Sequence, residues 1–271
     1  LNIDESLIER HITARTRAIV VVHYAGVGCE MDVILDIAAR HGLVVIEDNA
    51  HGLFGRYRGQ LLGTFGQLAT QSFHETKNFT CGEGGALLIN DDRYIATAEI
   101  IREKGTNRAR FFRGQVDKYT WVGLGSSYLP SDILAAVLLS QLESRDCIQT
   151  ARREIFTCYA DALAEWASTN GVGLPHVPAQ CDQAYHMFYL MLPSLAVRQR
   201  LITHLRERGV LAVFHYVPLH LSEMGISLGG APGDCPVTEE KSDRLLRLPF
   251  FNDLSSEDLA YVVESILAFT P

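Results

Sequence analysis

The chain has 271 residues, enough for one large domain or two smaller ones. Hydrophobic residues make up 47% of it and charged residues 21%, which excludes wholesale disorder and allows a packed core. The formal net charge of −8 disfavours a nucleic-acid-binding protein, although a local basic patch is compatible with it.

Signals for a membrane or secretory location are not found in the sequence. No apolar run approaches the roughly 18 residues of a transmembrane helix, and the first residues lack the basic and apolar stretches of a signal peptide. The six cysteines form no C-x-x-C pair and are scattered along the chain. This usage predicts reduced, mostly buried thiols and a cytoplasmic protein without a membrane partner.

A β-α-β unit is predicted near the start of the chain. Residues 18–23 (AIVVVH) form an apolar, β-branched run typical of a buried strand. A helix is expected over residues 30–41, ended by Gly42, and a second strand over residues 43–46. Because polar side chains beyond the carboxyl ends of such strands often face a ligand, we expect Glu47 and Asp48 to do so.

Five elements are predicted in the next part of the chain. They are a loop or hairpin over residues 53–66, strands over 68–73 and 86–90, a helix over 91–104 and a long loop over 105–128. The last of these is polar, basic and aromatic without a clear period, so we expect a functional loop.

A long helical region over residues 131–166, with a kink near 145–149, is expected to lead into a second domain. Domains are therefore predicted over residues 1–145 and 146–271. The remaining expected elements are strands over 185–192 and 210–216, helices over 195–208 and 255–269, and a loop over 225–236.

Lys77 lies in a polar turn that glycines follow at 82, 84 and 85. Most lysines are solvated surface residues, but a lysine that attacks an aldehyde must be reachable and neutral when it reacts. Asp48 is either a turn residue or a carboxylate facing a pyridine nitrogen. His51 is either structural or beside a ring, and Ser72 either caps a turn or binds a phosphate.

Basic residues cluster in the 102–118 region, which contrasts with the acidic remainder. They form either a solvated basic face or an anion site for a diphosphate or a carboxylate, where the guanidinium fork is useful. The members of this cluster are Arg102, Lys104, Arg108, Arg110, Arg113 and Lys118.

Other kinds of site are disfavoured. His215 and His220 flank a proline, but no third ligand lies at recognisable zinc spacing, so no metal is expected. The sequence contains no G-x-S-x-G, P-loop or G-x-G-x-x-G motif, which weakens hydrolase, nucleoside-triphosphatase and dinucleotide-binding interpretations.

An ordered set of motifs resembles the DegT/DnrJ/StrS sugar aminotransferases over essentially the whole chain. These motifs are residues 2–4 (NID), 22–26 (VHYAG), 47–52 (EDNAHG), 72–78 (SFHETKN) and 82–85 (GEGG). The resemblance implies an α/β, fold-type-I enzyme that uses pyridoxal phosphate (PLP). It also implies a mostly parallel central sheet and a smaller α+β C-terminal domain.

The resemblance also implies roles for individual residues. Lys77 would hold the cofactor aldehyde through its amine and shuttle a proton. Asp48 would pair with the pyridinium nitrogen, Ser72 would hold the phosphate, and His51 would lie by the ring, where many relatives carry Gln. Arg108, Arg113, Lys118 and His215 are the candidates for substrate binding.

Three stretches look closest to the branch that forms dTDP-4-amino-4,6-dideoxygalactose for enterobacterial surface polysaccharides. They are residues 102–108 (REKGTNR), 111–121 (FFRGQVDKYTW) and 214–220 (FHYVPLH). The implied substrates are glutamate and a dTDP-linked 4-keto-6-deoxy sugar, in a homodimer with shared active sites.

The chain also departs from the family pattern. It begins where the family is already within its large domain, so we expect it to lack the loop that grips the phosphate and an aromatic that stacks on the ring. Ser127 and Leu134 stand where relatives carry Asn and Gln. A non-catalytic relative acting as a binding or oligomerisation module is therefore the alternative. Lys77 disfavours a related PLP-dependent sugar dehydratase, in which histidine replaces the lysine.

Overall fold

The computed structural model describes residues 1–270, and in it the chain forms two compact units. The first unit contains residues 1–145 and also residues 179–184. The second contains residues 146–178 and 185–271, of which residues up to 270 are described.

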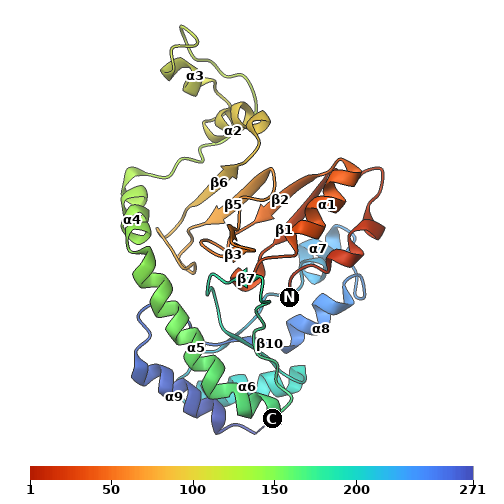
Figure 1. Cartoon of the computed structure of the whole chain (residues 1–271), viewed down its shortest axis with the longest axis vertical. Coiled ribbons are helices and arrows are strands. Elements are labelled where there is room, and N and C mark those ends of the chain that lie inside the picture. Colours follow the sequence, from red (N-terminus) through yellow and green to blue (C-terminus); the bar gives the residue numbers. More distant parts are fainter. Residues whose placement is uncertain (271) are drawn as a thin grey trace. The chain divides into compact units, whose positions relative to one another are not determined.

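A four-stranded sheet forms the centre of the first unit (Figure 1). Its strands are β1 (Ala18–Val22), β2 (Val44–Asp48), β5 (Leu68–Ser72) and β6 (Gly85–Ile89), in the order β1-β2-β5-β6. The first three are parallel, and β6 pairs antiparallel with β5. This confirms the predicted α/β class and the mostly parallel sheet.

Helix α1 (Met31–His41) connects β1 to β2 and ends at Gly42, whose φ of +62° suits a residue without a side chain. Ile34 and Ile37 of this helix are buried, as are Val21 and Val45 in the strands. Because side chains alternate across a strand, one sheet face is covered and carries these buried residues.

The opposite face of this sheet, called the open face below, carries exposed apolar side chains. Val20 is 57% exposed, Val22 42% and Leu87 48%. The strand register places Val22, Asp48, Thr70 and Leu87 in one row across this face. The carboxyl end of β2 therefore presents Asp48 on the side of the sheet that α1 does not cover.

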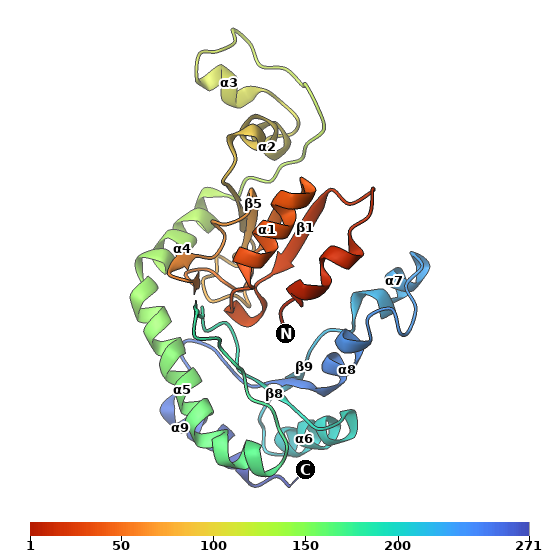
Figure 2. The ribbon, with the colours of Figure 1, turned by 45° about the vertical axis from the view of Figure 1, so that its right-hand side comes forward.

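Three short strands and the helices α2, α3 and α4 complete the first unit. A hairpin of β3 (Arg56–Tyr57) and β4 (Gln60–Leu61) pairs with β7 (Cys181–Asp182) in the order β4-β3-β7. Helices α2 (Ile95–Arg102) and α3 (Arg108–Phe112) extend away from the central sheet in Figure 2. Helix α3 lies within residues 105–128, where we expected only loop, and α4 (Asp132–Glu143) ends at Ser144.

The second unit contains a three-stranded antiparallel sheet and five helices among its described residues. Strands β8 (Tyr189–Met191), β10 (Leu245–Arg247) and β9 (Val213–Phe214) lie in that order. The helices are α5 (Arg145–Thr169), α6 (Leu195–Glu207), α7 (Glu223–Ser227), α8 (Pro236–Arg244) and α9 (Ser256–Leu267).

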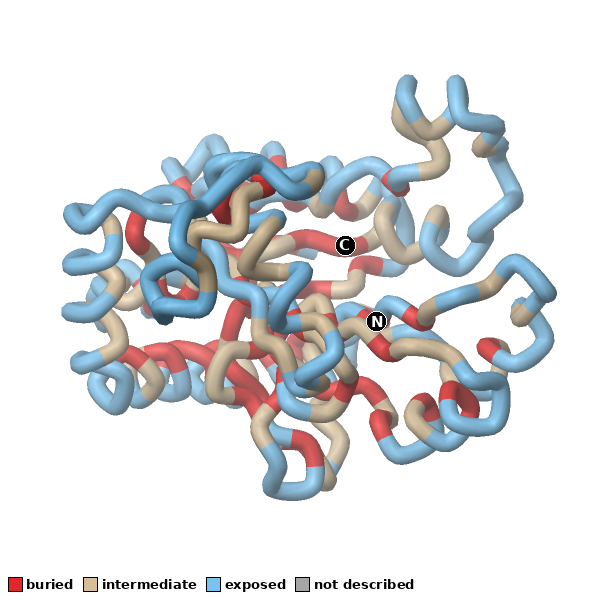
Figure 3. The backbone as a smooth tube through the Cα atoms, turned by 90° about the horizontal axis from the view of Figure 1, so that it is seen from above, coloured by how far each residue is buried: buried red, intermediate tan, exposed pale blue. Residues whose placement is uncertain are grey.

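Buried aromatic and aliphatic residues of α5, α6, α9 and the strands form the core of the second unit, including Tyr159, Phe188, Leu201 and Ile266. Figure 3 shows buried and exposed residues alternating along the elements. Helix α8 was not predicted, because its sequence PVTEEKSDR is polar and carries no apolar stripe.

The cysteines are all free, but only half of them are buried. Cys29, Cys81 and Cys181 are buried, whereas Cys147, Cys158 and Cys235 are exposed, so the expectation of mostly buried thiols is wrong. Among residues 1–270, no helix combines the length and the apolar character needed to cross a bilayer.

Candidate active site

Asp48 and Ser72 are the last residues of neighbouring parallel strands, β2 and β5. Asp48 pairs with Thr70, and residues two apart in a strand point to the same face, so both side chains belong to the open face. Both residues are half-buried, which leaves them reachable from solvent. The structure thus brings an acid and a hydroxyl together at one sheet edge.

The contacts of these two side chains leave them able to bind a ligand. Asp48 accepts a hydrogen bond from the Ala50 backbone N–H through Oδ1, at 3.1 Å. Its other oxygen has no hydrogen-bond partner among residues 1–270. The Ser72 hydroxyl accepts a long hydrogen bond of 3.5 Å from the His74 N–H. A carboxylate oxygen and a hydroxyl proton therefore remain available.

Lys77 lies in a loop over residues 73–84 that continues from the strand carrying Ser72. The Phe73 N–H donates to the Gly84 carbonyl at 2.8 Å, and the Cys81 N–H donates to the Phe73 carbonyl at 3.0 Å. The Lys77 N–H donates to the His74 carbonyl at 2.9 Å, which forms a tight turn. These hydrogen bonds join the two ends of the loop, called its neck below. The half-buried Lys77 lies in the turn that begins at His74.

His51 is held by the turn that follows β1. The Ala25 N–H donates to His51 Nδ1 at 3.3 Å, and the Tyr24 ring meets the imidazole edge-on with centroids 5.8 Å apart. Asn2 braces this turn: its amide donates to the Val27 carbonyl at 3.0 Å, and its Oδ1 accepts from the Tyr24 N–H at 2.9 Å. Asn2 belongs to the NID motif at residues 2–4, and its role in holding this turn is not evident from the sequence.

Glu47 does not face the open side, so the expectation that it faces a ligand together with Asp48 is wrong. Its carboxylate is fully buried and lies 2.9 Å from Nε2 of the equally buried His23. The backbone N–H groups of Gly63, Phe65 and Gly66 also donate to it, each at 2.7 Å. Because neighbouring strand residues alternate between faces, one of the two acids had to point into the interior.

This buried network decides the charge state of Glu47. Burial pushes its pKa upward, but hydrogen bonds from His23, Gly66 and Gly63 more than offset burial and hold the pKa below the usual 4.5. His23 Nδ1 accepts from the Cys29 N–H at 3.1 Å, so the imidazole carries its proton on Nε2. Burial raises the pKa of the Cys29 thiol to about 12. Glu47 is therefore a structural anion beneath the site.

The basic candidates lie in the α2–α3 part of the first unit, and two of them are in ion pairs. Arg108 contacts Glu103 at 2.7 Å and stacks over the Phe112 ring at 5.1 Å. Arg113 binds both oxygens of Glu99, at 2.7 and 2.8 Å. Lys118 is exposed. An anionic substrate would have to compete with these carboxylates for Arg108 and Arg113.

His215 belongs to the second unit and follows β9 directly. Burial and the nearby Arg247 lower the pKa of its imidazole to about 4, so it is neutral at pH 7. Within residues 1–270, no group of three or more His, Cys, Asp or Glu side chains is arranged to hold a metal ion.

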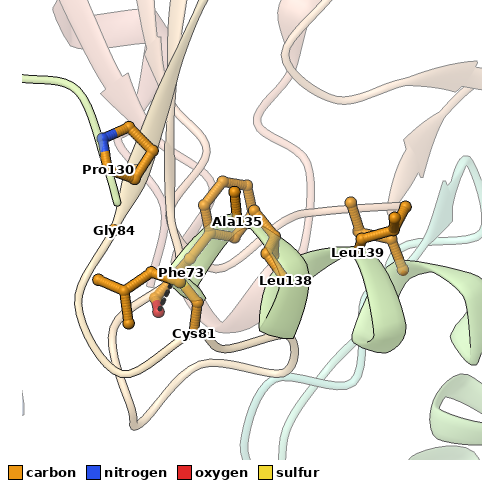
Figure 4. A pocket seen from close by; sticks show the side chains of 10 residues that line it. Phe73, Cys81, Gly84, Pro130, Ala135, Leu138 and Leu139 are labelled. Atoms are coloured by element: carbon orange, nitrogen blue, oxygen red, sulfur yellow. Dashed lines mark hydrogen bonds between the residues drawn. The ribbon is translucent and has the colours of Figure 1, made fainter. Parts of the chain in front are cut away.

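An apolar pocket of about 240 Å³ lies beside the lysine loop, within the first unit. Figure 4 shows Phe73 and Cys81 on one side and Ala135, Leu138 and Leu139 of α4 on the other. Its lining includes neither Asp48, Ser72 nor Lys77, so it is distinct from the polar cluster.

Comparison with known proteins identifies the family. Residues 1–267 match the model of the DegT/DnrJ/EryC1/StrS aminotransferase family. The chain belongs to this family.

Two curated relatives and two solved structures illustrate the match. A pleiotropic regulatory protein of Geobacillus stearothermophilus is 35% identical over 99% of the chain and 69% of its own length. The spore coat polysaccharide biosynthesis protein SpsC of Bacillus subtilis is 31% identical over 98% of this chain and 70% of its own length. DesV of S. venezuelae is 30% identical with a TM-score of 0.86, over 100% of this chain and 70% of that one. The sugar aminotransferase CalS13 of Micromonospora echinospora is 26% identical with a TM-score of 0.85, over 99% of this chain and 71% of that one.

These comparisons make the chain a PLP-dependent transaminase by family and support transfer of an amino group to a sugar. The cofactor is pyridoxal phosphate, and the residues present fit it. A carboxylate (Asp48) and a hydroxyl (Ser72) end neighbouring strands of one sheet, an amine (Lys77) lies in the loop that follows Ser72, and all three residues are half-buried.

Proposed function

We propose that the chain transfers an amino group from glutamate to the 4-keto carbon of dTDP-4-keto-6-deoxyglucose, giving dTDP-4-amino-4,6-dideoxygalactose. Residues 102–108, 111–121 and 214–220 support this choice of acceptor through their resemblance to that branch. The observation that carries the proposal is the placement of Asp48 and Ser72 on one face at adjacent strand ends, with Lys77 five residues beyond Ser72.

Each of these residues has a stated task in the proposal. PLP, when bound, supplies the electron-withdrawing ring that this chemistry needs. Asp48 keeps a proton on the ring nitrogen, Ser72 donates to a phosphate oxygen, and the Lys77 amine holds the cofactor and moves a proton at the reacting carbon. His51, which the Ala25 N–H holds in place, would lie beside the ring. Arg108, Arg113, Lys118 and His215 are the proposed substrate contacts.

A spectroscopic test separates this proposal from the alternative of a non-catalytic binding module. Wild type with added PLP is expected to develop a visible band that borohydride fixes and glutamate bleaches. Lys77→Ala should lose the PLP that borohydride fixes to the protein, called the covalent label below, while Lys104→Ala, at an exposed lysine outside the proposed cofactor and substrate contacts, should retain it. A folded wild-type chain that forms no such band would favour the binding module.

The choice of acceptor needs its own measurement. The protein loaded with glutamate-derived nitrogen is offered dTDP-4-keto-6-deoxyglucose and, in parallel, its UDP counterpart. We expect the 4-amino sugar from the dTDP substrate, detected by mass spectrometry, with its configuration assigned by NMR. An equal or higher yield from the UDP sugar would contradict the proposed nucleotide.

A homodimer is also proposed. The last residue of α3, the segment that follows α3 and the start of α4 expose large apolar side chains, and such surfaces commonly mark interaction sites. These exposed residues are Phe112, Trp121, Leu124 and Ile133. Light scattering after gel filtration is expected to give twice the chain mass, and a monomer at micromolar concentration would contradict a stable dimer.

A further inference from the structure

Residues 179–184, called the returning segment below, belong to the first unit although the chain on both sides of them belongs to the second. Its strand β7 pairs antiparallel with β3, joining Cys181 to Tyr57. The Arg58 N–H also donates to the Gln180 carbonyl at 2.7 Å. The first part of the segment is therefore fixed to the β3–β4 hairpin.

Ala184, at the end of the returning segment, contacts two other parts of the first unit. Its N–H donates to the Gly26 carbonyl at 2.9 Å. Its carbonyl accepts a hydrogen bond of 2.6 Å from the side-chain amide of Asn78. Asn78 is only 5% exposed and Ala184 is fully buried, so water competes poorly for this hydrogen bond. One buried residue thus joins the 24–26 turn to the residue that follows Lys77.

The 24–26 turn is the one that holds His51, through the Ala25 N–H. A side-chain carbon at Gly26 would lie 2.9 Å from both the Ala184 Cβ and the His51 carbonyl, so these backbones approach without spare room. Ala25 has a φ of +56° and Tyr185, next to Ala184, a φ of +51°. Left-handed backbone is unfavourable for residues with a side chain and persists only where surrounding contacts hold it.

We propose that Asn78 is a positioning residue for Lys77, which it fixes relative to His51 through the Ala184 carbonyl. The neck of the lysine loop is closed by Phe73, Gly84 and Cys81, but these hydrogen bonds join the loop only to itself. The Asn78 amide joins it to a residue 106 positions away in the sequence. This inference rests on the proposed function, since it concerns the reactivity of the Lys77 amine.

The test compares Asn78→Ala and the isosteric Asn78→Asp, which removes the donor but keeps the volume, with Asn90→Ala. Asn90 is the matched control, because its amide also donates to backbone carbonyls of the first unit, those of Gly63 and Gly66, at 3.0 and 2.8 Å. Each variant is measured for its melting temperature, for hydrogen exchange of residues 74–81 without PLP, and for the rate at which the borohydride-fixable label forms on Lys77.

We expect both Asn78 variants to fold, to exchange faster over residues 74–81, and to acquire the label at least tenfold more slowly, the factor expected for losing about one buried hydrogen bond. Asn90→Ala should stay within twofold of wild type in both readouts. Asn78 variants that melt earlier but label and exchange at the wild-type rate would show a purely structural role and overturn the inference. Failure of both variants to fold would do the same.

The proposed function fails separately. If wild type forms no Lys77-dependent label, the result contradicts the covalent role of Lys77 and, with it, the positioning role of Asn78. If wild type forms the label and the Asn78 variants match it, only the positioning role is lost.

Discussion

Glu47 and Asp48 are adjacent acids in one strand, yet their surroundings give them different properties. Asp48 is half-buried on the open face, whereas Glu47 is enclosed by His23 and three backbone N–H groups. One side chain can meet a ligand, and the other joins the ends of β1 and β2 to the turn at residues 63–66. Glu47 therefore supports the strand end that presents Asp48.

Glu47→Gln should strongly destabilise the first unit. The amide nitrogen would replace one acceptor oxygen and face donors, so groups that are now satisfied would be left without partners. Breaking a buried pair in this way typically costs about 3–5 kcal/mol. Urea denaturation checks the loss. Asp36→Asn, which breaks an exposed pair with Arg40 at 3.0 Å, is the control, with an expected effect below about 1 kcal/mol.

Acid should weaken the same contact. The folded-state pKa of Glu47 lies below its ordinary 4.5, so the folded protein binds a proton here less readily than the unfolded chain. The contribution to stability is fully present above about pH 4.5 and is lost as the pH falls through the folded-state pKa. Glu47→Gln should flatten the pH dependence of unfolding in this window. An unchanged slope would show that Glu47 titrates normally.

The His215 imidazole offers a pKa that can be measured directly. Burial, followed by the charge of Arg247, lowers this pKa to about 4, so the His215 ring signal should titrate well below the ordinary 6.5 in an NMR pH series. Arg247→Gln should move it upward, because a positive neighbour is removed. The assignment follows from the signal lost in His215→Asn. A midpoint near 6.5 in wild type would contradict the lowered pKa that its half-buried position implies.

At the scale of elements, serine side chains cap the N-termini of several helices. Ser131, Ser194, Ser222 and Ser255 each accept a hydrogen bond from a backbone N–H in the first turn of their helix. Ser131 and Ser255 are also the first residues of helices predicted from sequence, over 131–166 and 255–269, since each directly precedes an apolar periodic stretch.

Ser255→Ala should destabilise the second unit by about 1 kcal/mol. The Ser255 hydroxyl accepts from the Asp258 N–H at 3.0 Å and donates to the Asp258 carboxylate at 2.7 Å, so both bonds would be lost at the start of α9. Ser256→Ala, one residue later and without a cap, should change stability by less than about 0.5 kcal/mol. Thermal unfolding of the two variants measures the difference, and equal melting temperatures would argue against the cap.

Elements with a strong local pattern were predictable, and those defined by tertiary pairing were not. The apolar runs of β1 and β2 and the amphipathic α1 lie close to their predicted bounds, although β1 is buried on one face only. In contrast, β8 covers only three residues of the expected strand over 185–192. Phe188 and Leu192 flank it and are buried in the core without belonging to the strand, so hydrophobicity alone overstates its length.

For the whole molecule, sequence order explains which parts of the candidate site could be predicted to lie together. Asp48, Ser72 and Lys77 lie within 30 residues of one another, and parallel strands bring their carboxyl ends to one edge. The contact between Asn78 and Ala184 spans 106 residues and involves a backbone carbonyl, which any residue could supply. No side-chain pattern marks such a position, so the returning segment was not anticipated.

The route of the returning segment limits how this protein could be recombined with its relatives. A chimera joined at residue 145 would keep β3 and Asn78 from one parent but take β7 and the Ala184 carbonyl from the other. The two parts of the chain are therefore not independent modules in inheritance or in engineering. A successful exchange would have to transfer residues 179–184 together with the surfaces of the first unit that they contact.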